Sequence, residues 1–305
     1  MSGLGFGIDG GGTRSRLCVF DWDTGEERCR LVGESTNLYS VGTQAALEHV
    51  GALLGSAGFP LAAYRGGCIG SAGLSRPAER RIFASYFAEQ MPGCPVYLCN
   101  DGETLLVGAL GSRSGYALIS GTGSIALGRD EGGRVVRAGG LGYMLGDEGS
   151  ALWIGWQAIM RALRAREGRD LQTGLLEPLV RFFGLSGPDD FVAMLHQRFD
   201  KREIASAAQL VLQAAQSDPL AGDIARRAAR ELALLVKSVR EQLPLPAMRV
   251  ALSGGVLENS AFMREALDSE LRGCYPQVQI VLARGEAVVG ACMLARGQAD
   301  ACACI

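Results

Sequence analysis

The chain contains the same unusual unit twice: an apolar strand enters a Gly-rich turn and leaves through a second strand that ends in aspartate. Near the N-terminus the unit reads GIDGGGTRSRLCVFD, and in the middle of the chain it reads LISGTGSIALGRD. A second pair of similar segments, ETLLVGA and EAVVGA, follows in the same order, and both indicate helices with small residues on one side. Repetition of a whole unit predicts a duplicated α/β fold with two similar domains facing a cleft.

The rest of the pattern supports two domains of mixed strands and helices. The polar segment GSRS at residues 111–114 predicts a boundary between an N-terminal domain, 1–113, and a C-terminal domain, 114–289, with the last helix, 290–305, packing back on the first. Periodicity and Gly punctuation predict strands at 4–8, 15–21, 27–33, 67–72, 96–99, 115–120, 125–129, 249–252 and 278–282. Helices are predicted at 43–54, 77–90, 103–110, 146–165, most of 173–243, 261–271 and 287–296.

Composition excludes several classes of function. A net charge of −2 on 305 residues gives no basic surface for nucleic acid, and no apolar run is long enough to cross a membrane, so a cytoplasmic protein is expected. The only lysines are Lys201 and Lys237, and neither lies in a P-loop or protein-kinase motif. The two histidines and the scattered cysteines, including Cys302 and Cys304, lack metal-site spacing.

The first glycine turn is a candidate phosphate site. Gly10, Gly11 and Gly12 allow a phosphate to approach the backbone amides closely, and Thr13 adds a hydroxyl donor. Asp9, at the strand end, can hold magnesium or its water shell. The alternative is a plain hairpin turn, in which glycines only relieve positive φ.

The second glycine turn repeats this arrangement with Gly121, Thr122, Gly123 and Ser124. Two such turns facing each other suit the two ends of a triphosphate better than one turn would. Any nucleotide must therefore be held by backbone amides, hydroxyls and magnesium rather than by a lysine.

Asp101 is the candidate general base. It follows a predicted strand and precedes a helix, where an aspartate stays ionised and can accept a proton from a sugar hydroxyl. The alternative is a helix N-cap, a role that Asp fills commonly, and the sequence alone does not decide between them. Asp147 either binds sugar hydroxyls or caps the helix that follows it. Gly254 and Gly255 join a strand to a helix, where a glycine turn could lie flat against adenine.

Taken together, these strings resemble the N-acetylglucosamine kinase and BadF-type ATPase branch of the actin/hexokinase/Hsp70-like superfamily. The matching strings run in the family's order from residue 7 to residue 295: GIDGGGTRS, STN, ND, LISGTGS, GGLGYMLGDEGSALWIG, ALSGGVLEN and EAVVGACMLA. The resemblance implies an actin-like (ribonuclease H-like) ATPase fold, use of ATP and Mg²⁺, closure around the substrate and a homodimer.

By position, the resemblance also implies roles for individual residues. These are the catalytic base (Asp101), sugar contacts (Asn37, Ser124, Asp147), the phosphate and magnesium shell (Asp9, Gly10, Gly11, Gly12, Thr13, Gly121, Thr122, Gly123) and the adenosine wall (Gly254, Gly255). The implied reaction is phosphorylation of an amino sugar, N-acetylglucosamine to its 6-phosphate.

Alternatives remain open on the sequence. Ile125 stands where mammalian-type enzymes carry Asn, and Leu141 stands where they carry Trp, so glucosamine and other hexoses remain alternative substrates. An activator ATPase of the BadF type is an alternative of another class, although it would need cysteines placed for an iron–sulfur cluster.

Overall fold

The chain forms two compact units, each described here by itself. The computed structural model describes the backbone of residues 3–302 and the side chains of residues 3–297, so the side chains of Cys302 and Cys304 lie outside the described part. Unit 1 comprises Met1–Ser114, Arg129–Val135 and Ala283–Ile305, and unit 2 comprises Gly115–Gly128 and Val136–Leu282. The sequence placed residues 129–135 and 283–289 in the second domain, whereas the structure groups them with the first.

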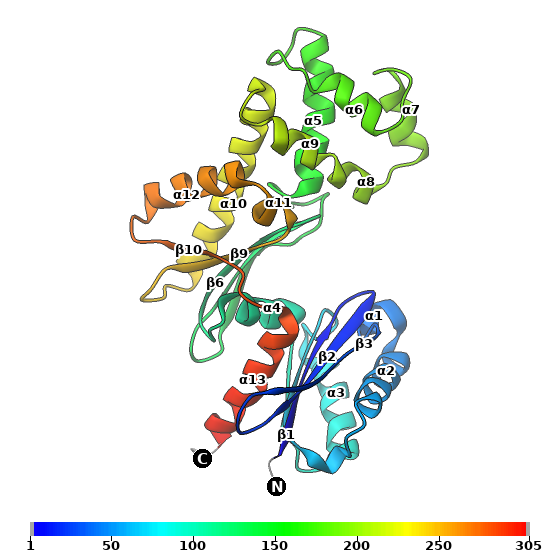
Figure 1. Cartoon of the computed structure of the whole chain (residues 1–305), viewed down its shortest axis with the longest axis vertical. Helices are drawn as coiled ribbons and strands as arrows, with labels where there is room; N and C mark the ends of the chain where they lie inside the picture. The colour runs from blue at the N-terminus through cyan, green and yellow to red at the C-terminus, as the bar shows by residue number, and fades with distance from the viewer. Residues whose placement is uncertain (1–2, 303–305) are drawn as a thin grey trace. The chain divides into compact units, whose positions relative to one another are not determined.

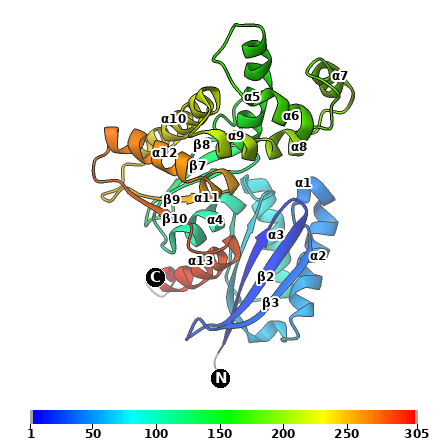
Figure 2. The same cartoon turned by 45° about the horizontal axis from the view of Figure 1, so that its top comes forward.

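Unit 1 is built on a five-stranded mixed sheet with the order β3-β2-β1-β4-β5. Its strands are β1 (Leu4–Gly10), β2 (Arg14–Asp21), β3 (Glu27–Glu34), β4 (Tyr64–Ser71) and β5 (Val96–Cys99). β1 pairs antiparallel with β2 and parallel with β4, and β4 pairs parallel with β5. The helical elements are α1 (Leu38–Val41), α2 (Thr43–Ser56), the short 3₁₀ helix η1 (Leu61–Ala63), α3 (Pro77–Gln90), α4 (Asp101–Leu110) and α13 (Ala287–Cys302). Figures 1 and 2 show α2 and α3 on one face of the sheet and α13 on the other.

Unit 2 carries a second five-stranded sheet, with the order β8-β7-β6-β9-β10. Its strands are β6 (Gly115–Ser120), β7 (Ser124–Arg129), β8 (Val135–Gly139), β9 (Arg249–Ser253) and β10 (Gln279–Leu282). Its helices are α5 (Ala151–Arg166), α6 (Leu176–Phe182), α7 (Asp190–Gln197), α8 (Lys201–Ser206), α9 (Ala208–Ala214), α10 (Pro219–Gln242), α11 (Gly255–Asn259) and α12 (Ala261–Cys274). In chain order, α5 to α9 form an insertion between β8 and α10.

The two sheets have the same topology. Strands one to five of unit 1 occupy the same places as strands six to ten of unit 2, and the outer pairs β4–β5 and β9–β10 are both parallel. The duplicated fold predicted from the repeated strings is therefore confirmed. Each unit also has its own apolar core: Phe6 and Ile8 are central to one, and Leu118 and Val250 to the other.

Helices α4 and α13, which carry the second pair of repeated strings, pack closely in unit 1. A Cβ on Gly108 would collide with the carbonyl oxygen of Glu286, and one on Gly290 would collide with that of Thr104. The backbone amide of Arg284 also donates to the carbonyl of Ala109 at 3.0 Å. The small residues predicted on these helices therefore allow their backbones to touch.

One predicted helix begins later than expected. The sequence predicted a helix from residue 146, but α5 begins at Ala151, with Ser150 as its N-cap. Asp147 and Gly149 both have positive φ, at 65° and 77°, which a helix cannot accommodate. Residues 146–149 therefore form a loop in which Asp147 is held in a fixed orientation. No helix among the described residues meets the length and apolarity that a membrane span requires.

Candidate active site

The first glycine turn, between β1 and β2, is closed by the amide of Gly11, which donates to the carbonyl of Arg14 at 3.1 Å. Gly10 is needed for packing, because a Cβ there would collide with Oγ1 of Thr36. Gly12 is different: its φ is not positive, and the nearest atom to an added Cβ would be 3.8 Å away. The fold does not require glycine at this position, so a ligand that approaches the backbone would explain it.

Two carboxylates lie at the ends of neighbouring elements in unit 1. Asp9 is at the end of β1, 15% exposed, with a carboxylate oxygen 3.6 Å from a guanidinium nitrogen of Arg16. Burial raises the pKa of Asp9, Arg16 opposes this shift, and the negative charge of Asp101 raises the pKa further. The two carboxylates are thus close enough to repel each other.

Asp101 is the first residue of α4, and the cap of this helix is its neighbour. Asn100 is the N-cap, and its side-chain oxygen accepts from the amide of Glu103 at 2.9 Å. The alternative reading of Asp101 as the N-cap is therefore wrong. Its carboxylate accepts from the amide of Gly102 at 3.0 Å. Burial raises the pKa of Asp101 despite that hydrogen bond. A half-buried carboxylate of raised pKa suits a general base.

The carboxylate of Asp9 fits a magnesium ion that is held in part by other ligands. Within the described residues, no group of three or more His, Cys, Asp or Glu side chains is arranged to hold a metal. Mg²⁺ binds through one or two carboxylates, waters and substrate phosphates rather than in an all-protein cage. The negative charge of Asp101 raises the pKa of Asp9, and a cation bound to Asp9 would offset that effect.

Asn37, a predicted sugar contact, caps the short helix α1. Its side-chain oxygen accepts from the amide of Tyr39 at 3.0 Å, which leaves the amide nitrogen as a donor. That nitrogen lies on the side of Gly12, 3.9 Å from the position of an added Cβ. Asn37 and the open glycine of the first turn therefore line the same part of unit 1.

The second glycine turn, between β6 and β7, holds the loop that precedes α5. The amide of Gly121 donates to the carbonyl of Gly123 at 3.0 Å, and the amide of Ala151 donates to the carbonyl of Gly121 at 2.8 Å. No protein atom lies within 4 Å of a Cβ built on Gly121, and its φ is not positive. Thr122, at the tip of the turn, is exposed. The free space above Gly121 matches that above Gly12 in the other unit.

Asp147 is fixed against this turn. It is the only described non-glycine residue with positive φ, and its carboxylate accepts from the amide of Ser124 at 3.3 Å. The carboxylate also lies 2.9 Å from a Cβ built on Gly123. Ser124 itself is 2% exposed, and its hydroxyl donates to the carbonyl of Glu148 at 2.8 Å. The hydroxyl predicted to contact sugar is therefore used within the fold, where Ser124 holds the loop that carries Asp147.

The turn opens onto a pocket of about 770 Å³ in unit 2. Gly121, Thr122 and Gly255 border it, so the structure brings the second phosphate-binding candidate and the predicted adenosine wall together. Gly254 lies behind them with φ 94°, and a Cβ there would collide with the carbonyl of Ser120. The sequence did not point to the rest of the lining, which comes from α8, α9, the segment after α9, α11 and the start of α12. It includes Arg202, Gln209, Gln213, Gln216, Asn259 and Phe262.

Comparison with known proteins identifies the family. The model of the BadF/BadG/BcrA/BcrD ATPase family matches residues 6–295, which include both glycine turns and both carboxylates. The chain belongs to this family. Its similarity to a curated N-acetylmuramic acid/N-acetylglucosamine kinase of Clostridium acetobutylicum is 32% identity, over 96% of this chain and 98% of the relative. It is 26% identical to an N-acetyl-D-glucosamine kinase of Dictyostelium discoideum, over 95% of this chain and 96% of the relative.

Solved structures agree with this assignment. A structure described as a candidate N-acetylglucosamine kinase from Chromobacterium violaceum has a TM-score of 0.68 and 30% identity, with coverage of 96% of this chain and 99% of that chain. The resemblance inferred from the motifs and the two-domain α/β architecture are both confirmed. The individual site residues remain predictions, supported by where the fold puts them.

Proposed function

We propose that the protein is an ATP-dependent amino-sugar kinase that transfers the γ-phosphoryl group of ATP to the 6-hydroxyl of N-acetylglucosamine. The observation that supports this most strongly is the pocket of about 770 Å³ bordered by Gly121, Thr122 and Gly255. It is large enough for a nucleotide, and it belongs to a chain that is 32% identical to a kinase of N-acetylated sugars.

In this proposal the nucleotide is bound mainly by backbone. The adenosine lies along Gly255 and the polar side chains of α9, and the phosphates lie near the free backbone of Gly121. Gly12 in unit 1 offers free backbone of the same kind. Neither packing nor backbone conformation requires glycine at these two positions. The nearest non-adjacent protein atom to an added Cβ would be at least 3.8 Å away at both. Backbone amides that a phosphate can approach closely form an anion-binding site.

Asp101 acts as the base on the sugar. As the sugar oxygen bonds to the γ-phosphorus, the bond from that phosphorus to the β-γ bridging oxygen breaks and ADP departs. The hydroxyl proton moves to the carboxylate of Asp101, late in the transfer, because the chemistry is chiefly positioning and neutralisation of charge. Asn37 in unit 1 and Asp147 in unit 2 are each proposed as a sugar contact. Asp9 would hold Mg²⁺, which supplies positive charge to the phosphates.

The test of this function is ADP release measured in a coupled assay with a panel of sugars. We expect turnover with N-acetylglucosamine, and ³¹P and ¹H NMR of the product should show the phosphate on O6. Glucosamine, glucose and N-acetylmuramic acid complete the panel, because the sequence left the other hexoses open and the Clostridium relative is named for both N-acetylated sugars. Absence of sugar-dependent ADP release across the panel would refute the kinase.

Asp101→Asn tests the proposed base. General-base assistance is worth roughly 10²–10⁴-fold, so we expect kcat to fall by about that factor while KM for sugar and ATP changes little. The matched control is Asp23→Asn, which removes a carboxylate of unit 1 that is 58% exposed and paired with Arg65, and it should keep full turnover. Near-wild-type turnover in Asp101→Asn would exclude Asp101 as the base.

The assembly and the location of the protein are also part of the proposal. The family resemblance predicts a homodimer, and the sequence pattern predicts a cytoplasmic protein. Sedimentation equilibrium with and without sugar tests the dimer, and a single species at the 32.1 kDa of one chain would contradict it.

A further inference from the structure

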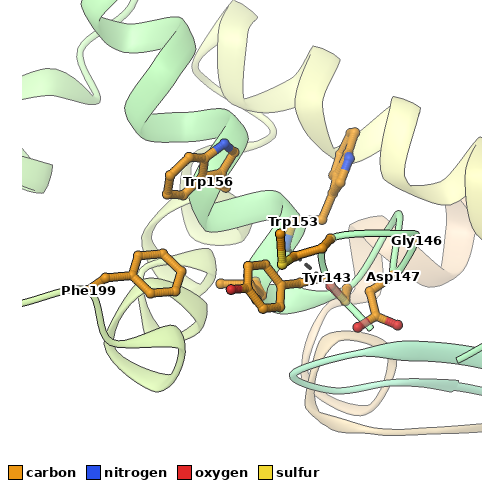
Figure 3. Close-up of a pocket in the computed structure, with 9 residues that line it drawn as sticks. Tyr143, Gly146, Asp147, Trp153, Trp156 and Phe199 are labelled. Atoms are coloured by element: carbon orange, nitrogen blue, oxygen red, sulfur yellow. Dashed lines mark hydrogen bonds between the residues drawn. The ribbon is translucent and has the colours of Figure 1, made fainter. Parts of the chain in front are cut away.

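Unit 2 has a second, smaller pocket of about 280 Å³ beside the start of α5. Aromatic side chains from three segments line it: Tyr143 from the loop before α5, Trp153 and Trp156 from α5, and Phe199 from the segment before α8. The Tyr143 and Phe199 rings stack with centroids 5.8 Å apart, and Trp156 meets Phe199 edge-to-face at 6.0 Å. Figure 3 shows the rings of Tyr143, Trp156 and Phe199 grouped together.

Some of these aromatic side chains are only partly buried. Tyr143 remains 44% exposed and Phe199 39% exposed, and the neighbouring Met144 is 81% exposed. Large apolar side chains that gather around a pocket and stay in contact with solvent are typical of a ligand site. Trp, Tyr and Phe also suit the apolar parts of sugar derivatives, because they offer large rigid contact surfaces.

The pocket shares one wall with the proposed sugar site. Asp147 lines it, and the same residue is bound to the second glycine turn through the amide of Ser124, 3.3 Å away. Its positive φ of 65° is a strained conformation for a residue with a side chain, and such strain is concentrated at functional sites. A sugar bound to the Asp147 carboxylate would therefore lie next to the aromatic pocket.

The charge of the lining indicates what kind of substituent fits. Asp147 is its only charged lining residue among the described residues. Lys201 lies close by, with Nζ 4.9 Å from the centre of the Tyr143 ring, but the residue is exposed to solvent. An anionic substituent would be buried among apolar surfaces with no cationic side chain in the described lining, which is unfavourable. A neutral acyl group meets no such cost.

The size of the pocket sets a further limit. The carbonyl carbon, oxygen and methyl of an acetyl group occupy on the order of 90 Å³, taking roughly 30 Å³ for each water-sized group. This is about a third of the 280 Å³ available.

We propose that this pocket binds the N-acyl substituent of the amino sugar and that it accepts acyl chains longer than acetyl. The inference rests on the proposed kinase function and adds to it the part of the substrate that determines specificity.

The first experiment is a chain-length series of glucosamine derivatives with the wild-type protein: the free amine, N-acetyl, N-propionyl and N-butyryl. We expect kcat/KM to rise from the free amine to the N-acetyl sugar and to hold or rise by up to about fourfold per methylene, since burying a methylene is worth ~0.8 kcal/mol. A drop of tenfold or more from N-acetyl to N-propionyl would overturn the proposal.

Two variants test the lining residues. Trp156→Ala should lower the ratio of kcat/KM for N-acetylglucosamine to that for glucosamine by at least tenfold, the range that apolar pocket contacts supply. Gly146→Leu adds bulk where a Cβ would have its nearest contact at 3.5 Å. It should reject N-butyryl first and N-acetyl next. The matched control is Phe182→Ala in α6, an aromatic residue 41% exposed outside the pocket, which should leave the ratio unchanged.

The outcomes separate this inference from the proposed function. If N-acetylglucosamine is phosphorylated but Trp156→Ala slows every sugar equally, the kinase stands and the acyl pocket is wrong. If no sugar is phosphorylated, the kinase is wrong, and tryptophan fluorescence still tests the pocket. N-butyrylglucosamine should then change the emission of Trp153 and Trp156 at lower concentration than glucosamine does, and equal responses would overturn the proposal.

Discussion

Removal of the Glu103 carboxylate should destabilise unit 1 far more than removal of a matched exposed carboxylate. Glu103 lies in the first turn of α4, two residues after Asp101, and its side chain is 5% exposed. One of its oxygens accepts from the hydroxyl of Tyr97 and from Nε of Arg129, both at 2.8 Å. The Arg129 side chain is 4% exposed and also donates to the carbonyl of Arg113 at 2.7 Å.

The expected magnitude follows from this burial. Burial alone would lower the pKa of Arg129, but its hydrogen bond and charge interaction with Glu103 outweigh burial and leave the pKa raised. Glu103→Ala would leave the guanidinium buried without its counter-charge and the Tyr97 hydroxyl without an acceptor. Breaking a buried pair in this way costs about 3–5 kcal/mol.

Glu286 provides the matched control, because it begins the second copy of the repeated helix string. It pairs with Arg30 at 2.9 Å, but the two side chains are 58% and 37% exposed. Exposed pairs contribute about 0–1 kcal/mol, so Glu286→Ala should be almost neutral. The double variant Glu103→Leu/Arg129→Met should recover part of the loss, because apolar replacement of both partners leaves no buried charge.

Urea unfolding followed by tryptophan fluorescence would measure these differences. Phe in place of Trp153 and Trp156 leaves Trp22 as the one tryptophan, and it reports on unit 1. If Glu103→Ala costs no more than Glu286→Ala, or if the double variant is less stable than either single one, the reasoning from burial is refuted.

Two further predictions concern the glycines and the pH dependence. Gly121→Ala should leave the free energy of unfolding unchanged or raise it by up to ~1 kcal/mol. The KM for ATP should rise, because the added methyl group enters the space proposed for phosphate. Gly254→Ala should instead lower the urea midpoint, because Gly254 has φ 94° and an added Cβ would collide with the carbonyl of Ser120. Burial raises the pKa of Asp101 in the folded state above its ordinary value of 3.8. The free energy of unfolding therefore falls as pH rises from the unfolded-state pKa to the folded-state pKa, because the buried carboxylate becomes ionised. Asp101→Asn should therefore be more stable than wild type at pH 7, with a difference that shrinks as pH approaches 3.8. An equal difference at both pH values would contradict this, as would Gly121→Ala with unchanged KM.

The repeated strings were sufficient to predict the architecture. Residues 4–21 and residues 115–129 each contain two strands joined by a glycine turn, and they form the first hairpin of their unit. The remaining strands have the same order in both sheets. Helix periodicity predicted the observed bounds of α3. The small residues of the two repeated helices predicted close packing, and the structure shows it at Gly108 and Gly290.

Local backbone conformation and the lining of the pockets could not be predicted. In a sequence, an aspartate before a helix is equally consistent with an N-cap and with a free carboxylate. The structure excludes Asp101 as the N-cap, because the amide of Glu103 donates to the side chain of Asn100. The positive φ of Asp147 has no sequence signal, since Gly is the usual residue there. Trp153 and Trp156 lie in an amphipathic helix, where periodicity indicates an apolar face but not that Phe199 will meet it.

The path of the chain between the units has a consequence for biosynthesis. The chain passes from one unit to the other four times, so no single cut releases an intact half. During synthesis the first sheet leaves the ribosome early, yet the face that contacts Cys292 near Gly7 stays uncovered until α13 has been made. Unit 2 can fold in the interval, because its two segments end before α13 begins. The half that starts first should therefore be completed last, and it is the half in greater need of a chaperone.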